Sequence, residues 1–244
     1  MGESILCSIV LIKEKDSFLI ATNRDELLDR PSEGPEIRQG KILKNFSPRD
    51  SLKGGTWLGL NEKGLFVGIT NRFTPQTNKD LKSRGEIPYL ALDCATPSEA
   101  ISKMSLLEPK DYNPFHLVLV NTNEALIFWS DGQKFHTENL KEGIHIVTES
   151  SFGAGDNLRA SHFEKRLKQF SMNSPIQSFK SLLGEKVDPS FCGPCIHIPE
   201  KNYGTRSSLI IKITSKEHEF HYSNTSPDEP NWVDYKYLMP EVLK

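Results

Sequence analysis

The chain has 244 residues, of which 36% are hydrophobic and 25% charged, so it can bury a substantial core, and we expect a single domain spanning residues 1–244. Its net charge of -2 and the absence of a long basic run argue against nucleic-acid binding and against a membrane-surface footprint. No stretch approaches the roughly 20 apolar residues that a membrane helix needs, and no secretory signal is recognisable, so we expect a cytoplasmic protein without membrane insertion.

The chain opens with a predicted β-hairpin. Residues 5–12 and 18–21 form two apolar runs, and a charged tetrapeptide at 13–16 separates them. The second run is followed by Thr22 and then by the polar stretch Asn23-Arg24-Asp25-Glu26. The first strand therefore carries a cysteine, and the second strand ends in charged side chains.

The register of this hairpin predicts which side chains share its open end. With the turn centred between Glu14 and Lys15, facing positions sum to 29, which places Cys7 opposite Thr22. A thiol beside a guanidinium and two carboxylates favours a nucleophile site. The candidate residues at this end are Cys7, Asn23, Arg24, Asp25 and Glu26.

The next segment reads as a long loop followed by a second hairpin. Residues 27–50 are polar and contain prolines, which is typical of a flap that covers a site. A glycine-pivoted turn then leads into a strand at 53–60, and the turn at 61–64 joins it to a strand at 65–70. This hairpin also ends in a polar residue, Asn71.

The remaining two thirds of the chain mix helices and strands. A Thr-Pro-Ser-Glu start at residue 96 predicts a helix cap. Helices are expected at 87–94, 97–106, 157–170 and 176–183, and strands at 115–120, 125–130, 144–148, 207–214 and 217–223. In the third helix the apolar face should hold Leu158, Phe163, Leu167 and Phe170, with Arg159 among the solvated residues. Paired strands at both ends with helices between them predict an α+β layered fold.

Seven ordered blocks along the chain resemble the NRDE family, which is the family of transport-and-Golgi-organisation protein 2. The blocks are Cys7, Ala21-Thr22-Asn23-Arg24-Asp25-Glu26, Arg30-Pro31-Ser32, Gly54-Gly55-Thr56-Trp57-Leu58-Gly59, Gly68-Ile69-Thr70-Asn71, Ser83-Arg84-Gly85-Glu86 and Tyr203-Gly204-Thr205-Arg206-Ser207-Ser208. Together they cover nearly the whole chain.

The same landmarks are more distantly similar to cysteine N-terminal-nucleophile hydrolases of the choloylglycine hydrolase and penicillin V acylase type. This resemblance implies a four-layer αββα sandwich of antiparallel sheets and hydrolysis or transfer of an acyl group from a linear amide. It implies Cys7 as the nucleophile, Arg24 and Asp25 as orienting residues, Asn71 at the oxyanion, and Arg206 in the pocket. Asn23 and Trp57 would contact the substrate, with Trp57 as a core or pocket-wall residue.

The chain departs from the hydrolase pattern at two places. In those hydrolases the cysteine begins the mature chain and its α-amine is the general base, whereas here residues 1–6 precede Cys7. Where the hydrolases have Thr-Asn at a strand end, this chain has Thr148-Glu149. Glu149 would then meet the substrate as a carboxylate, and loss of one oxyanion donor costs about 3 kcal/mol of barrier.

Two other readings of the sequence remain open. The first is a carrier without catalysis that binds haem or an acyl thioester, because the family's eukaryotic members are linked to haem and lipid handling; Arg24 and Arg206 would hold the ligand's carboxylate or phosphate. The second is a redox or metal role for Cys192 and Cys195 with His197, which their loop-like flanks disfavour. We expect no metal and no resident cofactor, and a small-molecule substrate or an apolar acidic ligand as the partner.

Overall fold

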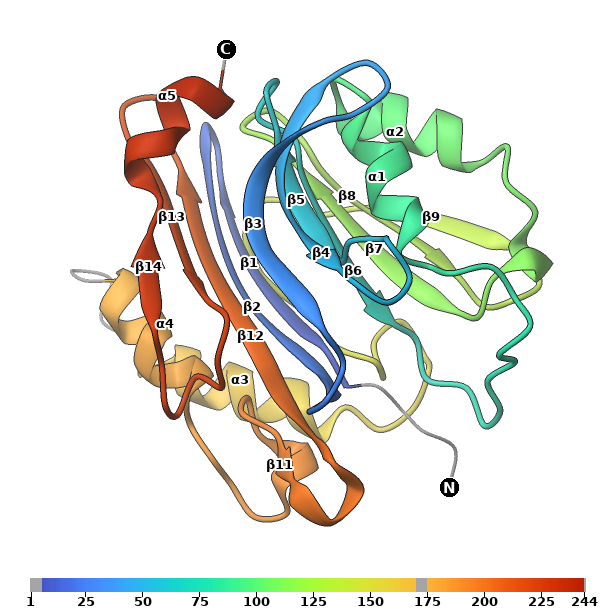
Figure 1. Cartoon of the computed structure of the whole chain (residues 1–244), viewed down its shortest axis with the longest axis vertical. Coiled ribbons are helices and arrows are strands. Elements are labelled where there is room, and N and C mark those ends of the chain that lie inside the picture. Colours follow the sequence, from blue (N-terminus) through green and yellow to red (C-terminus); the bar gives the residue numbers. More distant parts are fainter. Residues whose placement is uncertain (1–5, 170–174, 244) are drawn as a thin grey trace.

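The computed structural model describes residues 6–169 and 175–243, and these form two antiparallel sheets that pack face to face (Figure 1). The first sheet has the order β10-β1-β2-β12-β13-β14, with β11 beside β12. Its strands are β1 (Ser8–Glu14), β2 (Ser17–Leu27), β10 (Gly143–Val147), β11 (His197–Ile198), β12 (Tyr203–Ile213), β13 (His218–Ser223) and β14 (Trp232–Asp234). Strands from the two ends of the chain thus lie side by side in this sheet.

The second sheet runs through the middle of the chain without a crossover. Its strands follow in sequence order as β3 (Ser32–Gln39), β4 (Lys44–Asp50), β5 (Leu58–Asn61), β6 (Phe66–Asn71), β7 (Phe115–Val120), β8 (Ala125–Ser130) and β9 (Phe135–Asn139). Most neighbouring strands are joined by short connections because the sheet is antiparallel, whereas the connection between β6 and β7 spans residues 72–114 and carries two helices.

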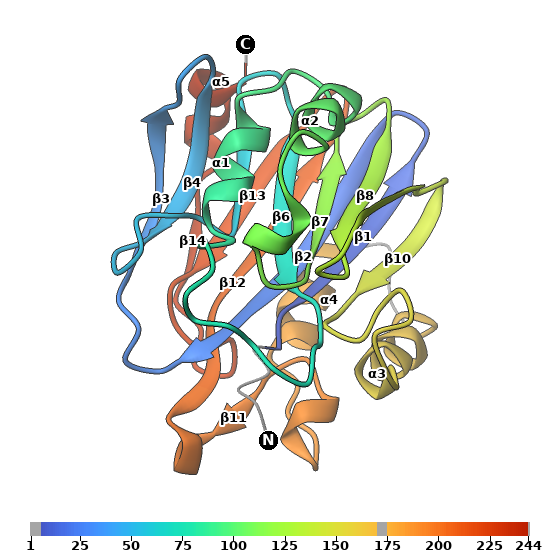
Figure 2. The ribbon, with the colours of Figure 1, turned by 90° about the vertical axis from the view of Figure 1, so that its right-hand side faces the viewer.

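Helices cover the outer face of each sheet, which Figure 2 shows from the side. These helices are α1 (Glu86–Leu92), α2 (Pro97–Met104), α3 (Leu158–Leu167) and α4 (Pro175–Leu183), whereas the short α5 (Met239–Val242) packs into the core between the sheets. The pair α1 and α2 packs on the second sheet, and the pair α3 and α4 packs on the first. The predicted α+β fold, a four-layer αββα sandwich, is confirmed. No described helix is long and apolar enough to cross a membrane.

Alternation along the strands divides the apolar side chains of the first sheet between two cores. Ile9, Leu11 and Ile20 meet the second sheet between the layers. Val10 and Ala21 meet α3 and α4 on the other face. Because side chains in a strand alternate between faces, the polar end of β2 must also divide its residues between the two cores.

The hairpin exists as predicted, but its register differs by two residues. Glu14 pairs with Ser17, so facing positions sum to 31 and Ser8 lies opposite Asn23. The turn is therefore Lys15-Asp16, one residue later than expected, because the first strand extends through Glu14. Continuing this register places Cys7 opposite Arg24 instead of Thr22. A shift of two residues leaves every side chain on its expected face.

The predicted flap at 27–50 is wrong, because this segment forms β3 and β4 at the edge of the second sheet. Both strands expose part of their length, so polar residues and Pro35 are tolerated there. Because partly exposed edge strands can contain polar residues and proline, the composition of this segment resembled that of a loop.

The helix caps agree with the sequence, but the buried face of α3 does not. Thr96 caps α2 by accepting a hydrogen bond from the backbone N–H of Glu99, and Asn157 caps α3 in the same way for Ala160. On α3 the buried residues are Arg159, Ala160, Phe163 and Leu167, while Leu158 is 61% exposed. The assignment of Arg159 to solvent and of Leu158 to the core was wrong, and Phe170 lies outside the described residues.

Candidate active site

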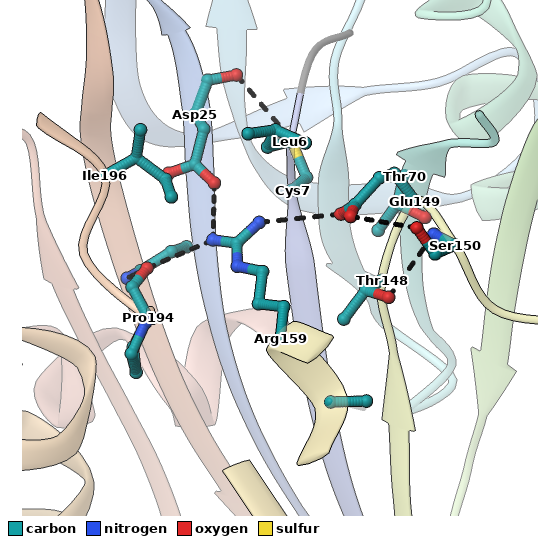
Figure 3. A network of polar contacts seen from close by, with 12 residues as sticks. Leu6, Cys7, Asp25, Thr70, Thr148, Glu149, Ser150, Arg159, Pro194 and Ile196 are labelled. Atoms are coloured by element: carbon teal, nitrogen blue, oxygen red, sulfur yellow. Dashed lines mark hydrogen bonds and ion pairs between the residues drawn. The ribbon is translucent and has the colours of Figure 1, made fainter. Parts of the chain in front are cut away.

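The candidate site lies where β1 and β12 begin and β2 ends. Asp25 of β2 pairs with Thr205 of β12, and Cys7 immediately precedes β1. The thiol of Cys7 donates a weak hydrogen bond to the main-chain carbonyl of Asp25, with Sγ and O 3.7 Å apart (Figure 3). The structure thus brings Cys7 to the polar end of β2.

Arg24 occupies the space between the sheets at this end. Its guanidinium is buried and lies 4.2 Å from the ring centre of Trp57, a cation–π contact. Its Nη2 is 3.6 Å from Oε2 of Glu26, and its Nη1 has no hydrogen-bond partner among the described residues. Trp57 thus packs against the guanidinium of Arg24, and its contact with a substrate stays a prediction.

A close approach of two glycines fixes the turn that carries Trp57. A Cβ on Gly55 would lie 2.6 Å from the carbonyl carbon of Gly85, and the backbone N–H of Thr56 donates to the Gly85 carbonyl at 2.9 Å. Only glycine at position 55 permits this contact, so the Trp57 turn and the Ser83-Arg84-Gly85 segment are held against each other.

Arg84 is a site residue to which sequence reasoning gave no role. Its Nη1 donates to the carbonyl of Pro114 at 2.9 Å. Burial lowers the pKa of Arg84 to about 10, and the negative charges of Glu26 and of a Cys7 thiolate oppose this fall. The signal was available in the Ser83-Arg84-Gly85-Glu86 block, but nothing in the sequence placed that block beside Cys7.

Asp25 faces the helix layer, on the opposite side of β2 from Arg24. Its carboxylate is fully buried, and it accepts hydrogen bonds from Nη2 of Arg159 at 2.6 Å and from Oγ1 of Thr205 at 2.5 Å. Burial raises the pKa of Asp25, and Arg159 and Thr205 oppose that rise. Asp25, the predicted neighbour of Cys7, is therefore held by Arg159 of α3 on the face of β2 that packs against the helices.

Glu149 follows β10 and reaches the same cluster. Its Oε2 lies 3.7 Å from Nη1 of Arg159 and has no hydrogen-bond partner among the described residues, as Figure 3 shows for the Arg159 contact. Arg72 holds the following loop by donating to the carbonyls of Ser151 and Phe152, each at 3.0 Å. Arg72 was not predicted, although it directly follows the candidate Asn71.

The other predicted site residues have different surroundings. Asn23 makes three hydrogen bonds on the helix face, to the carbonyls of Leu183 and Pro194 and from the hydroxyl of Ser208, which gives it a structural role. Asn71 is the last residue of β6 and is partly exposed. It lies at the end of its strand, as the sequence predicted.

Arg206 sits in an irregularity of β12. The register shifts between Thr205 and Ser207, so Arg206 is the extra residue of a bulge, and its Nε has no hydrogen-bond partner among the described residues. Burial raises the pKa of Tyr222 to about 12, while the charges of Arg24 and Arg206 both oppose the rise. The two arginines therefore act on one hydroxyl between the sheets.

Cys7 is protonated at neutral pH in this arrangement. Burial of the thiol, with the negative charge of Asp25, raises the pKa of Cys7 to about 12, and the charge of Arg24 offsets this only in part. The preceding residue is fixed as well, because the backbone N–H of Leu6 donates to the hydroxyl of Tyr203 at 2.6 Å. Arg24 does lower the pKa of Cys7, but its effect is smaller than that of burial.

This pKa gives a pH dependence that can be measured. We expect alkylation of Cys7 by iodoacetamide in the full-length protein to be slow at pH 7 and to rise about tenfold per pH unit through pH 10, because only the thiolate reacts. Peptide mapping by mass spectrometry identifies the modified cysteine. The urea-unfolded protein is the control, and its alkylation rate should level off near pH 9, whereas a plateau at that pH in the folded protein would contradict the raised pKa of Cys7.

Cys192 and Cys195 do not form part of a metal centre in the part of the chain that the structure describes. No group of three or more His, Cys, Asp or Glu side chains is placed to hold a metal ion there. Cys195 is buried, which raises its pKa to about 11, and its Sγ lies 3.7 Å from the hydroxyl of Ser226. What this loop contributes to the site is its main chain, because Gly193 and Pro194 accept hydrogen bonds from Arg159.

Comparisons of sequence find relatives over most of the chain. Residues 6–226 match the family described as Transport and Golgi organisation 2. The human Transport and Golgi organization protein 2 homolog is 24% identical over 235 residues, with 82% of this chain and 83% of the human protein covered. The Bos taurus homolog is 29% identical over 232 residues, with the same coverage.

Comparisons of structure find the same fold in two hydrolases. The Caenorhabditis elegans ortholog of N-acylethanolamine-hydrolyzing acid amidase has a TM-score of 0.56 and 15% identity, covering 84% of this chain and 92% of its own. A variant of conjugated bile acid hydrolase from Clostridium perfringens has a TM-score of 0.52 and 9% identity, covering 95% and 97%. The fold is therefore like that of the N-terminal-nucleophile hydrolases, as the sequence resemblance implied.

Proposed function

Because the chain belongs to the Transport and Golgi organisation 2 family and has a fold like that of N-terminal-nucleophile hydrolases, we propose that it hydrolyses or transfers an acyl group from a linear amide with Cys7 as the nucleophile. The observation that carries this proposal is the position of Cys7, in contact with the Asp25 carbonyl and near the cations Arg24 and Arg84. A thiol so placed can be activated once a base accepts its proton.

In the proposed reaction the sulfur of Cys7 attacks the amide carbonyl carbon and forms a tetrahedral oxyanion. Asn71 and Arg206 would stabilise this oxyanion, and Arg24 would orient the substrate against Trp57. The C–N bond then breaks, the amine leaves with the proton taken from the thiol, and an acyl thioester remains on Cys7. Water hydrolyses the thioester, or a second amine accepts the acyl group.

The base is the critical element of this mechanism. With Leu6 attached, the nitrogen of Cys7 is a peptide nitrogen and cannot accept a proton. A chain that begins at Cys7 has an α-amine there, which is the base that this class of hydrolase uses. We therefore propose that the catalytic form begins at Cys7.

A trapping experiment tests the proposal. Both the full-length chain and a chain that begins at Cys7 are incubated with a panel of fluorogenic N-acyl amides, and released amine and intact mass are followed. We expect amine release in the second form with a transient mass increase equal to the acyl group on the peptide of Cys7. The variant Cys7→Ala should show neither, and equal amine release in Cys7→Ala would refute the proposal.

Binding without turnover is the second candidate function, and the unpaired cationic atoms favour it. Nη1 of Arg24 and Nε of Arg206 are buried without a hydrogen-bond partner among the described residues, which suits a carboxylate or phosphate. An absorbance titration with haem, run beside an acyl thioester, separates the two functions. Saturable haem binding that Arg206→Ala abolishes, with no acyl transfer to Cys7, would support the carrier.

A further inference from the structure

Arg159 is a fully buried guanidinium that neither the sequence resemblance nor the proposed reaction assigns. It is the second residue of α3 and is 2% exposed. An arginine is rarely buried to this degree unless its charge and donors are matched, so its partners indicate why it is there. All of its described partners belong to the candidate site or to the loop behind it.

The contacts of Arg159 fix it from two directions. Its Nε donates to the carbonyl of Gly193 at 2.9 Å and its Nη2 to that of Pro194 at 3.1 Å. The same Nη2 donates to Oδ2 of Asp25 at 2.6 Å, and Nη1 lies 3.7 Å from Glu149. The guanidinium thus stands between two buried carboxylates, and its Nη2 is shared between Asp25 and the main-chain carbonyl of Pro194 (Figure 3).

The start of α3 is itself tied to the segment that carries Glu149. The side chain of Asn157 caps the helix, and the hydroxyl of Thr148 donates to the same amide oxygen at 2.8 Å. The helix end that carries Arg159 is therefore attached to the segment that carries Glu149. Its position can then determine that of Asp25.

We propose that Arg159 is a positioning residue of the candidate site, which locks the charged carboxylate of Asp25 and thereby sets the main-chain carbonyl of Asp25 against the thiol of Cys7. The lock consists of one short ion pair to Asp25, supported by the hydroxyl of Thr205 on the other carboxylate oxygen. The importance of Cys7 rests on the proposed function, whereas the link between Arg159 and Asp25 does not.

Charge balance around Asp25 explains why Arg159 is needed. Burial and the negative charge of Glu149 both raise the pKa of Asp25, and Arg159 is the principal group that opposes them. Without Arg159, Asp25 would take up a proton in the folded protein at a pH where it is ionised when unfolded. The titratable and charged groups that face Asp25 from its neighbouring elements are Cys7, Glu149, Arg159, Cys195 and Tyr203.

The sign of the resulting pH dependence follows from linkage. In Arg159→Gln the pKa of Asp25 lies further above its unfolded value than in the wild type, so the folded state binds a proton that the unfolded state releases. Stability is then retained at acid pH and lost as the pH rises toward the folded-state pKa. The unfolding equilibrium constant of Arg159→Gln, relative to wild type, should increase with pH by up to about tenfold per pH unit.

The experiment compares urea unfolding between pH 5 and 8 for matched variants. Arg166→Gln is the control on the same helix, because Arg166 pairs with Glu185 at the surface and its side chain is 40% exposed. We expect a pH-independent, small change for Arg166→Gln. Adding Asp25→Asn to Arg159→Gln should restore part of the stability at pH 8 and weaken the pH dependence, because Glu149 is then the one carboxylate of the pair that is left without Arg159.

A second measurement reports on Cys7 without requiring turnover. The charge of Asp25 raises the pKa of Cys7 by more than the hydrogen bond to the Asp25 carbonyl lowers it. Protonation of Asp25 in Arg159→Gln should therefore speed alkylation of Cys7 several-fold at pH 7.5, even where that hydrogen bond is weakened. Arg166→Gln should leave this rate unchanged.

Two results would overturn the proposal. One is a loss of stability in Arg159→Gln that is the same at every pH and unaffected by Asp25→Asn, since that is the signature of lost packing alone. The other is an unchanged rate of Cys7 alkylation. If Arg159→Gln does not fold, Arg159→Lys replaces it: the retained charge should keep the pH dependence of stability equal to that of the wild type. A steeper pH dependence in Arg159→Lys would contradict the role of the charge.

Discussion

A chain that begins at Cys7 is expected to hydrolyse an acyl amide about 10²–10⁴-fold faster than the full-length chain, which is the range of a positioned general base. Removing residues 1–6 converts the peptide nitrogen of Cys7 into an amine that can accept the thiol proton. In its protonated form this amine also adds a positive charge beside a thiol whose pKa is raised to about 12 by burial and by Asp25. Initial rates of amine release from one substrate measure the effect.

A chain that begins at Leu6 is the matched control for this truncation. It lacks residues 1–5, so it tests whether their removal alone increases access to the site, but it keeps Cys7 in peptide linkage. It also keeps the Leu6 nitrogen that contacts Tyr203. We expect this form to be as slow as the full-length chain. Equal gains in both truncated forms would show that access matters and the amine does not, and no gain in either would exclude this base.

The hairpin shows how much a sequence pattern can predict about a site. The turn was misplaced by one residue, which moved the partner of Cys7 from Arg24 to Thr22. The resulting shift of two residues preserved the alternation, so the proximity of Cys7, Arg24 and Asp25 survived the error. Apolar runs fix the faces of a strand pair more firmly than they fix its register.

One of the predictions that failed concerns a charged residue whose partners are distant in sequence. The periodicity of α3 assigned Arg159 to solvent because a charged residue at the start of a helix is usually solvated. Its partner Asp25 lies 134 residues earlier, and the carbonyls that hold it lie on another loop. No local pattern connects these segments.

Arg84 also has surroundings that its own stretch of sequence does not predict. Its sequence block was recognised, yet its proximity to Cys7 depends on the packing of Gly55 against Gly85, which joins two turns of the second sheet. Sequence reasoning can identify such blocks as landmarks. The contact that gives Arg84 its surroundings appears only when both sheets are assembled.

Glu149→Asn, placed in a chain that begins at Cys7, is expected to raise kcat for amide hydrolysis by about 10²–10³-fold, which is the contribution of one oxyanion donor. Glu149 can only accept hydrogen bonds as a carboxylate, and its Oε2 has no donor among the described residues. Asparagine would present an N–H in this place. Arg159 would keep its closer partner Asp25, at 2.6 Å, so the substitution does not leave the guanidinium unpaired.

Glu149→Ala separates the two consequences of this substitution. It removes the negative charge as Asn does, but it supplies no donor, so kcat should rise much less than in Glu149→Asn. Both variants are compared under saturating substrate, because an oxyanion donor acts on the transition state and should change kcat more than KM. If Ala is as fast as Asn, the carboxylate slows the reaction by repelling the oxyanion and the amide donor adds nothing. If neither variant is faster, Glu149 does not face the developing charge, and its contact with Arg159 serves the charge balance of Asp25 alone.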